Sequence, residues 1–159
     1  MLHIIGGIKM KLTNQQIGKC GELIVQYKLL SHGIESAPLT TDAGIDLVAF
    51  SSKKSTALTI QVKTNQKPKP GGGKGKLLID WWIPEKSPAN IFAFVELEKE
   101  RVWLVEAKLL PKLAQQNPEG KYHFYMYTDP TSKPRKDGLQ SNDYEFERYL
   151  LENLVHNFF

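Results

Sequence analysis

Apolar residues between positions 17 and 30 recur three or four places apart, the spacing of one face of an amphipathic helix. Thr13 and Gln16 precede this run with the spacing of a capping box, in which each side chain accepts a hydrogen bond from the other residue's backbone. Gly33 follows the run and suits the left-handed conformation that often ends a helix. We therefore predict a helix over residues 14–32.

The middle of the chain instead carries short runs of β-branched and aliphatic residues, bounded by turn-forming residues. Runs of this length and composition are typical of strands. The predicted strands span residues 34–39, 45–50, 57–64, 77–83, 91–98, 101–105 and 122–128. Further elements are a helix over 106–116, a polar loop over 129–142 and a closing amphipathic helix over 143–156.

Composition narrows the class of protein. Hydrophobic residues make up 41% and charged residues 24% of the chain, which is ordinary for a soluble globular protein and excludes a disordered chain or a membrane bundle. Cys20 is the single cysteine, so an internal disulfide framework and a Cys-rich zinc site are excluded. A reducing compartment is expected, hence a cytoplasmic protein with no membrane partner.

The length of 159 residues fits one domain. We expect residues 1–12 to form an N-terminal tail, because their apolar stretch is too short to span a bilayer. Residues 13–159 then form the single domain. Its core is expected over 13–128, and a C-terminal loop and helix over 129–159.

Basic residues exceed acidic ones by 21 to 17, a net charge of +4 that permits a polyanionic partner without proving one. Residues 65–76 hold four lysines, four glycines, two prolines and no acid. This composition predicts a flexible loop that is either simply solvated or orders on a nucleic-acid backbone. It is no nucleotide-binding P-loop, because the glycine spacing and the final Ser or Thr are missing. The candidate phosphate-binding residues are Lys67, Lys69, Lys74 and Lys76, with a second cluster at Lys133, Arg135 and Lys136.

Polar residues on two predicted neighbouring strands form the best candidate site. Side chains alternate along a strand, so Gln61 and Lys63 share one face while Val62 points to the other. A hairpin between the two strands brings Asp46 beside them, and Glu22 on the first helix could reach the same place. From spacing alone, these residues fit the wet face of an ordinary half-exposed hairpin better than a functional site.

Three short motifs in this order resemble the PD-(D/E)XK nuclease superfamily: Gly21-Glu22, Gly44-Ile45-Asp46 and Gln61-Val62-Lys63. They are most similar in form to Mrr-type restriction domains and archaeal Holliday-junction resolvases. The resemblance extends over about residues 13–116. It implies an α/β fold with a restriction endonuclease-like core, in which helices flank a central mixed β-sheet.

The resemblance also implies roles for individual residues. Asp46 would bind magnesium or manganese, helped by the Val62 backbone carbonyl and by Glu22, and Lys63 would be the catalytic lysine. Gln61 stands where the superfamily usually has an acid. Its amide oxygen can ligate a metal but brings no charge, so weak metal binding is expected.

The implied function is metal-dependent endonucleolytic hydrolysis of duplex or branched DNA. A homodimer is expected, because a duplex has two strands and a twofold dimer presents one site to each. The alternative is a catalytically inactive nucleic-acid-binding or assembly domain on the same fold. Trp81 and Trp82 are adjacent in a predicted strand, so one should be buried while the other could stack on a base or simply pack.

Overall fold

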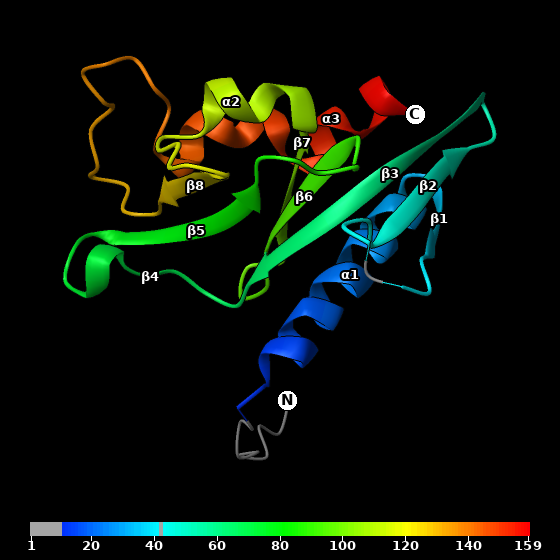
Figure 1. The fold of residues 1–159 in the computed structure, drawn as a ribbon, viewed down its shortest axis with the longest axis horizontal. Helices are drawn as coiled ribbons and strands as arrows, with labels where there is room; N and C mark the ends of the chain where they lie inside the picture. Colours follow the sequence, from blue (N-terminus) through cyan, green and yellow to red (C-terminus); the bar gives the residue numbers. More distant parts are fainter. Residues whose placement is uncertain (1–10, 42) are drawn as a thin grey trace, which may run out of the picture.

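The computed structural model describes residues 11–41 and 43–159 (Figure 1). It begins with helix α1 (Asn14–Ser31), whose capping box is formed as predicted. The Gln16 backbone N–H donates to Thr13 Oγ1 at 3.2 Å, and the Thr13 N–H donates to Gln16 Oε1 at 2.9 Å. These two bonds satisfy donors that have no partner within the helix, which explains why the helix starts here.

A five-stranded mixed sheet forms the centre of the molecule, in the order β1-β2-β3-β6-β7. Strands β3 and β6 are parallel and all other neighbours are antiparallel. The expectation of a central mixed sheet with flanking helices is confirmed. The strands are β1 (Glu35–Pro38), β2 (Leu47–Ser51), β3 (Lys54–Asn65), β6 (Ile91–Glu96) and β7 (Arg101–Glu106).

Helices cover one face of this sheet. Ile60 of β3 and Leu104 of β7 pack there in one buried cluster with Leu29 of α1 and Val155 of α3 (Leu151–Phe158). An ion pair between Lys28 and Glu152 joins the two helices at the surface. Alternation along the strands leaves the intervening residues on the opposite face.

A second sheet covers that opposite face. It is antiparallel, with the order β4-β5-β8, and Figure 1 shows β5 and β8 beside each other and away from β1 and β2. Its inner side chains, including Trp81 and Phe124, pack against Phe92 and Phe94 of the central sheet. The strands are β4 (Lys69–Pro70), β5 (Leu77–Pro84) and β8 (Lys121–Tyr127). The fold therefore has a helical layer, a central sheet and a smaller outer sheet.

Within the segment 65–76, which we expected to be a loop, the structure has a short strand and a turn. This segment forms β4 and a 3₁₀ turn, η1 (Gly71–Gly73), closed by a hydrogen bond from Gly75 N to Gly71 O at 2.7 Å. Gly72 and Gly73 have φ angles of 58° and 82°, which glycine adopts without the steric cost of a Cβ. The glycines here build a compact turn.

The predicted closing helix over 143–156 is also wrong as a single element. Residues Asp143–Tyr149 form a 3₁₀ helix, η3, and α3 begins only after Leu150. Leu150 is extended, with ψ 138°, because it forms an isolated β-bridge with Trp103 of β7. This bridge interrupts the helical path.

The predicted helix over 106–116 is much shorter than expected. It consists of η2 (Ala107–Leu109) followed by the single turn α2 (Leu110–Leu113). The chain then becomes extended because Gln116 and His123 of β8 exchange backbone hydrogen bonds of 3.3 and 2.9 Å. Pairing of Gln116 with β8 therefore ends the helix after Leu113.

The loop expected over 129–142 contains no helix or strand in the described structure. Of the expected N-terminal tail, residues 1–10 lie outside the described residues, and Lys11 and Leu12 precede α1 without regular structure. Within the described residues, every helix is too short or too polar to cross a membrane.

Candidate active site

Asp46 lies immediately before β2, which begins at Leu47, two residues after the start of the predicted strand over 45–50. Its backbone is nevertheless held on both sides: its N–H donates to Ile60 O and its carbonyl accepts from Leu39 N, both at 2.9 Å. Asp46 Oδ2 also accepts a 2.6 Å hydrogen bond from the Val62 backbone N–H. Asp46 is thus fixed between β1 and β3, with its carboxylate directed along β3.

Asp46 lies at the end of the pairing between β2 and β3. Leu47 is paired with Ile60, and the Asp46 N–H donates to the carbonyl of the same Ile60. Ile60 and Val62 pack toward α1, so alternation directs Gln61 and Lys63 to the other face. The Asp46 carboxylate meets β3 between these two residues, at the Val62 N–H.

Gln61 is almost buried, with 7% of its surface exposed. The Ser87 hydroxyl, from the connection between β5 and β6, donates to Gln61 Oε1 at 3.2 Å. Across the parallel pairing with β6, Gln61 neighbours Phe92 and the half-buried Lys63 neighbours Phe94. The two polar side chains thus border the apolar core between the sheets, where water has little access and charges interact strongly.

Glu22 lies on the opposite side of the sheet. It follows Gly21, which packs so closely on β3 that an added Cβ would stand 1.8 Å from Thr64 Oγ1. Although α1 therefore approaches β3 next to Lys63, the Glu22 carboxylate forms an ion pair with Lys19, with 2.6 Å between Nζ and Oε2. The sequence motif correctly locates the helix against β3, but this carboxylate is engaged elsewhere.

The donor set limits what metal this site could hold. No group of three or more His, Cys, Asp or Glu side chains within residues 11–41 and 43–159 is arranged to hold a metal ion. Asp46 offers a carboxylate and Gln61 a neutral amide oxygen, both hard oxygen donors of the kind that magnesium and manganese accept. One carboxylate and one amide would suit only a weakly held ion that keeps several waters.

The predicted basic residues lie on the second sheet and the loop after it. Lys69 Nζ is 3.2 Å from Asp80 Oδ1 of β5, and Arg135 Nη1 donates to Tyr125 Oη of β8 at 2.8 Å. Lys76 lies close enough to contribute, after hydrogen bonds from Thr131, to lowering the pKa of Asp129. The remaining predicted residues are exposed: Lys67, Lys74, Lys133 and Lys136.

Arg135 is also tied to its own loop. Its Nε lies 2.9 and 3.1 Å from the two carboxylate oxygens of Asp137. These hydrogen bonds lower the pKa of Asp137 to about 2 and raise the pKa of Arg135. Arg135 therefore orders the loop as well as contributing positive charge.

The sequence analysis did not find one polar cluster on the second sheet. His123 Nε2 lies 2.8 Å from Asp80 Oδ2, and His123 Nδ1 lies 3.0 Å from Gln116 Oε1. Trp82 stacks on the same imidazole, with ring centroids 4.1 Å apart and planes within 4°. These residues meet because β5 pairs with β8, a long-range contact for which the sequence carries no local signal.

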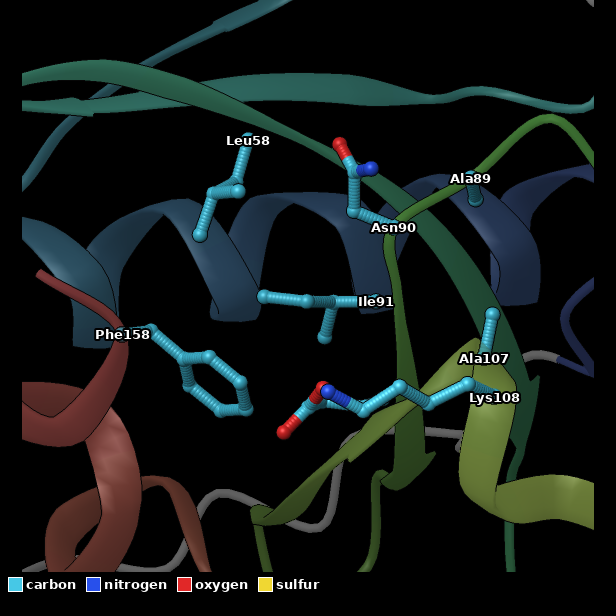
Figure 2. Close-up of a pocket in the computed structure, with 8 residues that line it drawn as sticks. Leu58, Ala89, Asn90, Ile91, Ala107, Lys108 and Phe158 are labelled. Carbon is cyan, nitrogen blue, oxygen red and sulfur yellow. The ribbon is translucent and has the colours of Figure 1, made fainter.

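A separate hollow of about 380 Å³ lies where the helix-covered face of the central sheet ends. Figure 2 shows Leu58, Ile91 and Phe158 pointing into it, with Lys108 crossing its edge. The Lys108 ammonium forms a 2.5 Å ion pair with Glu106 there. None of the predicted site residues lines this mostly apolar hollow.

Comparison with known proteins supports the fold. The sequence matches no protein-family model, and no curated protein matches it significantly. The bacterial homing endonuclease I-Ssp6803I superposes with a TM-score of 0.57 at 14% identity, covering 93% of this chain and 92% of that one. The Holliday junction resolvase Hjc of Archaeoglobus fulgidus has a TM-score of 0.48 at 14% identity, covering 67% of this chain and 82% of that one. The chain therefore shares the overall fold of this homing endonuclease, an α/β fold with helices flanking a central mixed sheet.

Proposed function

We propose that the protein is a metal-dependent DNA endonuclease that hydrolyses phosphodiester bonds at Asp46, Gln61 and Lys63. The observation that carries this proposal is the 2.6 Å hydrogen bond from Val62 N to the Asp46 carboxylate, which holds that carboxylate against the strand bearing Gln61 and Lys63. A nuclease fold supports it, since a homing endonuclease shares the architecture over nearly the whole chain. Residues 13–159 would act as one nuclease domain.

Each residue has a distinct part in this proposal. Asp46 and Gln61 would hold magnesium or manganese through their side-chain oxygens, with the Val62 carbonyl as a further ligand. A divalent ion supplies positive charge against the scissile phosphate and lowers the pKa of water. Lys63 donates hydrogen bonds that orient the attacking water and offset the negative charge that develops on the phosphate. Glu22 can assist only when its carboxylate leaves Lys19.

The basic residues of the second sheet and its following loop would contact DNA phosphates. Such contacts are independent of sequence and weaken as salt rises. Lys69 and Arg135 already have carboxylate partners, so the exposed residues Lys67, Lys74, Lys76, Lys133 and Lys136 should contribute most. A homodimer would present two sites to the two strands of a duplex.

Nicking of supercoiled plasmid and of branched DNA, with magnesium or manganese, tests this proposal. Asp46→Asn removes the carboxylate charge and Lys63→Ala removes the ammonium group, so each should reduce cleavage by at least about a hundredfold. Lys99→Ala, at an exposed lysine in the turn after β6, is the matched control and should cleave as the wild type does. Equal cleavage by wild type and both site variants would disprove the assignment.

One observation favours a second candidate, a binding or assembly domain without catalysis. Gln61 replaces a carboxylate, and no cluster of three candidate acidic, histidine or cysteine ligands occurs in the described part of the chain. This alternative predicts salt-dependent DNA binding that is the same with metal and with EDTA, and no cleavage with either ion. The nicking assay and a binding titration together distinguish the two functions.

A further inference from the structure

The outer face of the second sheet carries a row of aromatic side chains. Ile79 and Trp81 of β5 point inward to the core, so alternation directs Trp82 outward. In the antiparallel register Trp82 pairs with His123, and the row continues along β8 through Tyr125, which is only 6% exposed, to the half-buried Tyr127. Trp82 is 50% exposed, which is unusual for so large an apolar side chain and makes this face a candidate binding surface.

This row is held in a fixed arrangement. His123 stacks flat on Trp82 and is anchored by Asp80 and Gln116. The ring centroids of His123 and Tyr125 are 5.4 Å apart, as are those of Tyr125 and Tyr127. Arg135 holds the Tyr125 hydroxyl at 2.8 Å. A surface ordered in advance loses little conformational entropy when a ligand stacks on it.

A groove of about 230 Å³ runs between this row and the glycine turn. His123, Tyr125 and Tyr127 form one side, and Lys76 lies in the lining with the turn on the other. A Cβ added to Gly72 would meet nothing within 4 Å, so the turn leaves open space over its backbone. The groove thus combines aromatic rings with a backbone that a ligand can approach closely.

The charge around the groove is mainly positive. Lys74 and Lys76 are exposed on the turn, and Lys133 is exposed on the loop that Arg135 ties to Tyr125. The acidic side chain within the row, Asp80, is largely buried and is paired with Lys69 and His123. Two further acids lie in the loop after β8: Asp129 is near Lys76, and Asp137 is paired with Arg135. Aromatic rings with lysines at their margin match a ligand that has flat bases on a negatively charged backbone.

We propose that this groove binds an unpaired stretch of the DNA substrate, one base stacking against Tyr127 and the strand continuing toward Trp82. Lys74, Lys76 and Lys133 would contact its phosphates. Bases within an intact duplex are stacked on one another and do not offer their faces to a protein. The inference rests on the proposed nuclease function and narrows its substrate to DNA with a single-stranded segment.

Binding in EDTA tests the inference without requiring cleavage. Fluorescence anisotropy with a labelled oligodeoxythymidine and a blunt duplex should give tighter binding of the single strand. Trp82→Ala and Tyr127→Leu each remove one stacking ring, so each should weaken single-strand binding by about tenfold and leave duplex binding unchanged. Tyr27→Ala, at a 70% exposed aromatic residue of α1, is the control and should bind as the wild type does.

Tryptophan fluorescence gives a second readout. Trp81 and Trp103 are 3% and 1% exposed, so quenching by the oligonucleotide should come from Trp82. Trp82→Phe should abolish that quenching while retaining most of the affinity, because phenylalanine also stacks.

The inference is overturned if the wild type prefers the blunt duplex, or if both ring variants bind the single strand normally. Should the ring variants bind normally while Asp46→Asn abolishes cleavage, the nuclease proposal stands and the groove assignment fails. If the protein binds the single strand through Trp82 but never cleaves DNA, the proposal that the groove binds single-stranded DNA is supported and the proposal of nuclease activity is refuted.

Discussion

The backbone N–H of Val62 donates a 2.6 Å hydrogen bond to Oδ2 of Asp46 and so connects the residue before β2 with the middle of β3. A charge-assisted bond of this kind fixes the carboxylate against the strand that carries Gln61 and Lys63. The backbone of the hairpin therefore positions the Asp46 carboxylate. In the proposed site, the affinity for a metal ion then depends on the side chain at position 61.

Gln61→Glu should strengthen metal binding. The substitution restores a second negative charge near Asp46, and we expect manganese to bind about tenfold tighter, which corresponds to roughly 1.4 kcal/mol. Without metal the two carboxylates repel each other, so the variant should unfold at a lower temperature in EDTA. Calorimetric titration with manganese measures the first effect and thermal denaturation the second.

Gln26→Glu adds the same charge on α1, away from the hairpin face, and is the control for this change. It should leave manganese binding as it is in the wild type. If Gln61→Glu binds manganese no better than Gln26→Glu, then position 61 does not face the metal.

Gly21→Ala should destabilise the protein, whereas Gly18→Ala should stabilise it. A Cβ at residue 21 would stand 1.8 Å from Thr64 Oγ1, so α1 must move away from β3 at a cost of about 1–3 kcal/mol. A Cβ at residue 18 would meet nothing within 4 Å, and alanine in a helix interior is favoured over glycine by up to about 1 kcal/mol. Urea denaturation of both variants measures the difference, and destabilisation of equal size in the two would contradict the close packing.

Arg101→Met should be one of the more damaging substitutions outside the hydrophobic core. Glu96 is fully buried, and Arg101 Nε donates to its Oε2 at 2.6 Å while Nη1 donates to Asp143 Oδ2 at 2.8 Å. Without Arg101 the Glu96 carboxylate is left buried without a counter-charge, at a cost of about 3–5 kcal/mol.

Arg148→Met is the matched control, because Arg148 is exposed and its guanidinium lies over the Tyr149 ring. We expect it to lose no more than about 1 kcal/mol. Denaturant unfolding of the two variants should therefore differ by several kcal/mol, and similar losses would show that Glu96 finds another partner.

Acid should release the loop after β8 only at very low pH. The hydrogen bonds from Arg135 lower the pKa of Asp137 from 3.8 to about 2. Because the Asp137 pKa is lower in the folded loop than in the unfolded chain, its ionised form stabilises the folded loop at pH values above 3.8. That stabilisation is lost as the pH falls toward 2. Side-chain carboxyl NMR should follow the Asp137 titration directly. Arg135→Gln should return the pKa toward 3.8, and an unchanged titration would mean that another group lowers it.

Features that depend on neighbours in the chain could be predicted from the sequence. The capping box at Thr13 and Gln16 is local, and so is the alternation that separates Gln61 and Lys63 from Val62. The opposite burial of Trp81 and Trp82 follows from the same alternation and is confirmed. The central mixed sheet is confirmed as well, since the resemblance of the motifs implied it.

Other features required the tertiary structure. The glycine-rich segment 65–76 becomes ordered because β4 pairs with β5, and the closing helix is interrupted because Leu150 bridges to Trp103. Glu22 carries the expected motif, yet its carboxylate pairs with Lys19.

The sequence by itself determined the first helix, most of the strands and the face shared by Gln61 and Lys63, because capping and alternation act over a few residues. Only the tertiary structure decided that β5 pairs with β8 in a second sheet and is not part of the central sheet. That pairing covers Phe92 and Phe94 with a second apolar surface, and the gain comes from burial between segments far apart in the chain. The same pairing creates the outer aromatic groove.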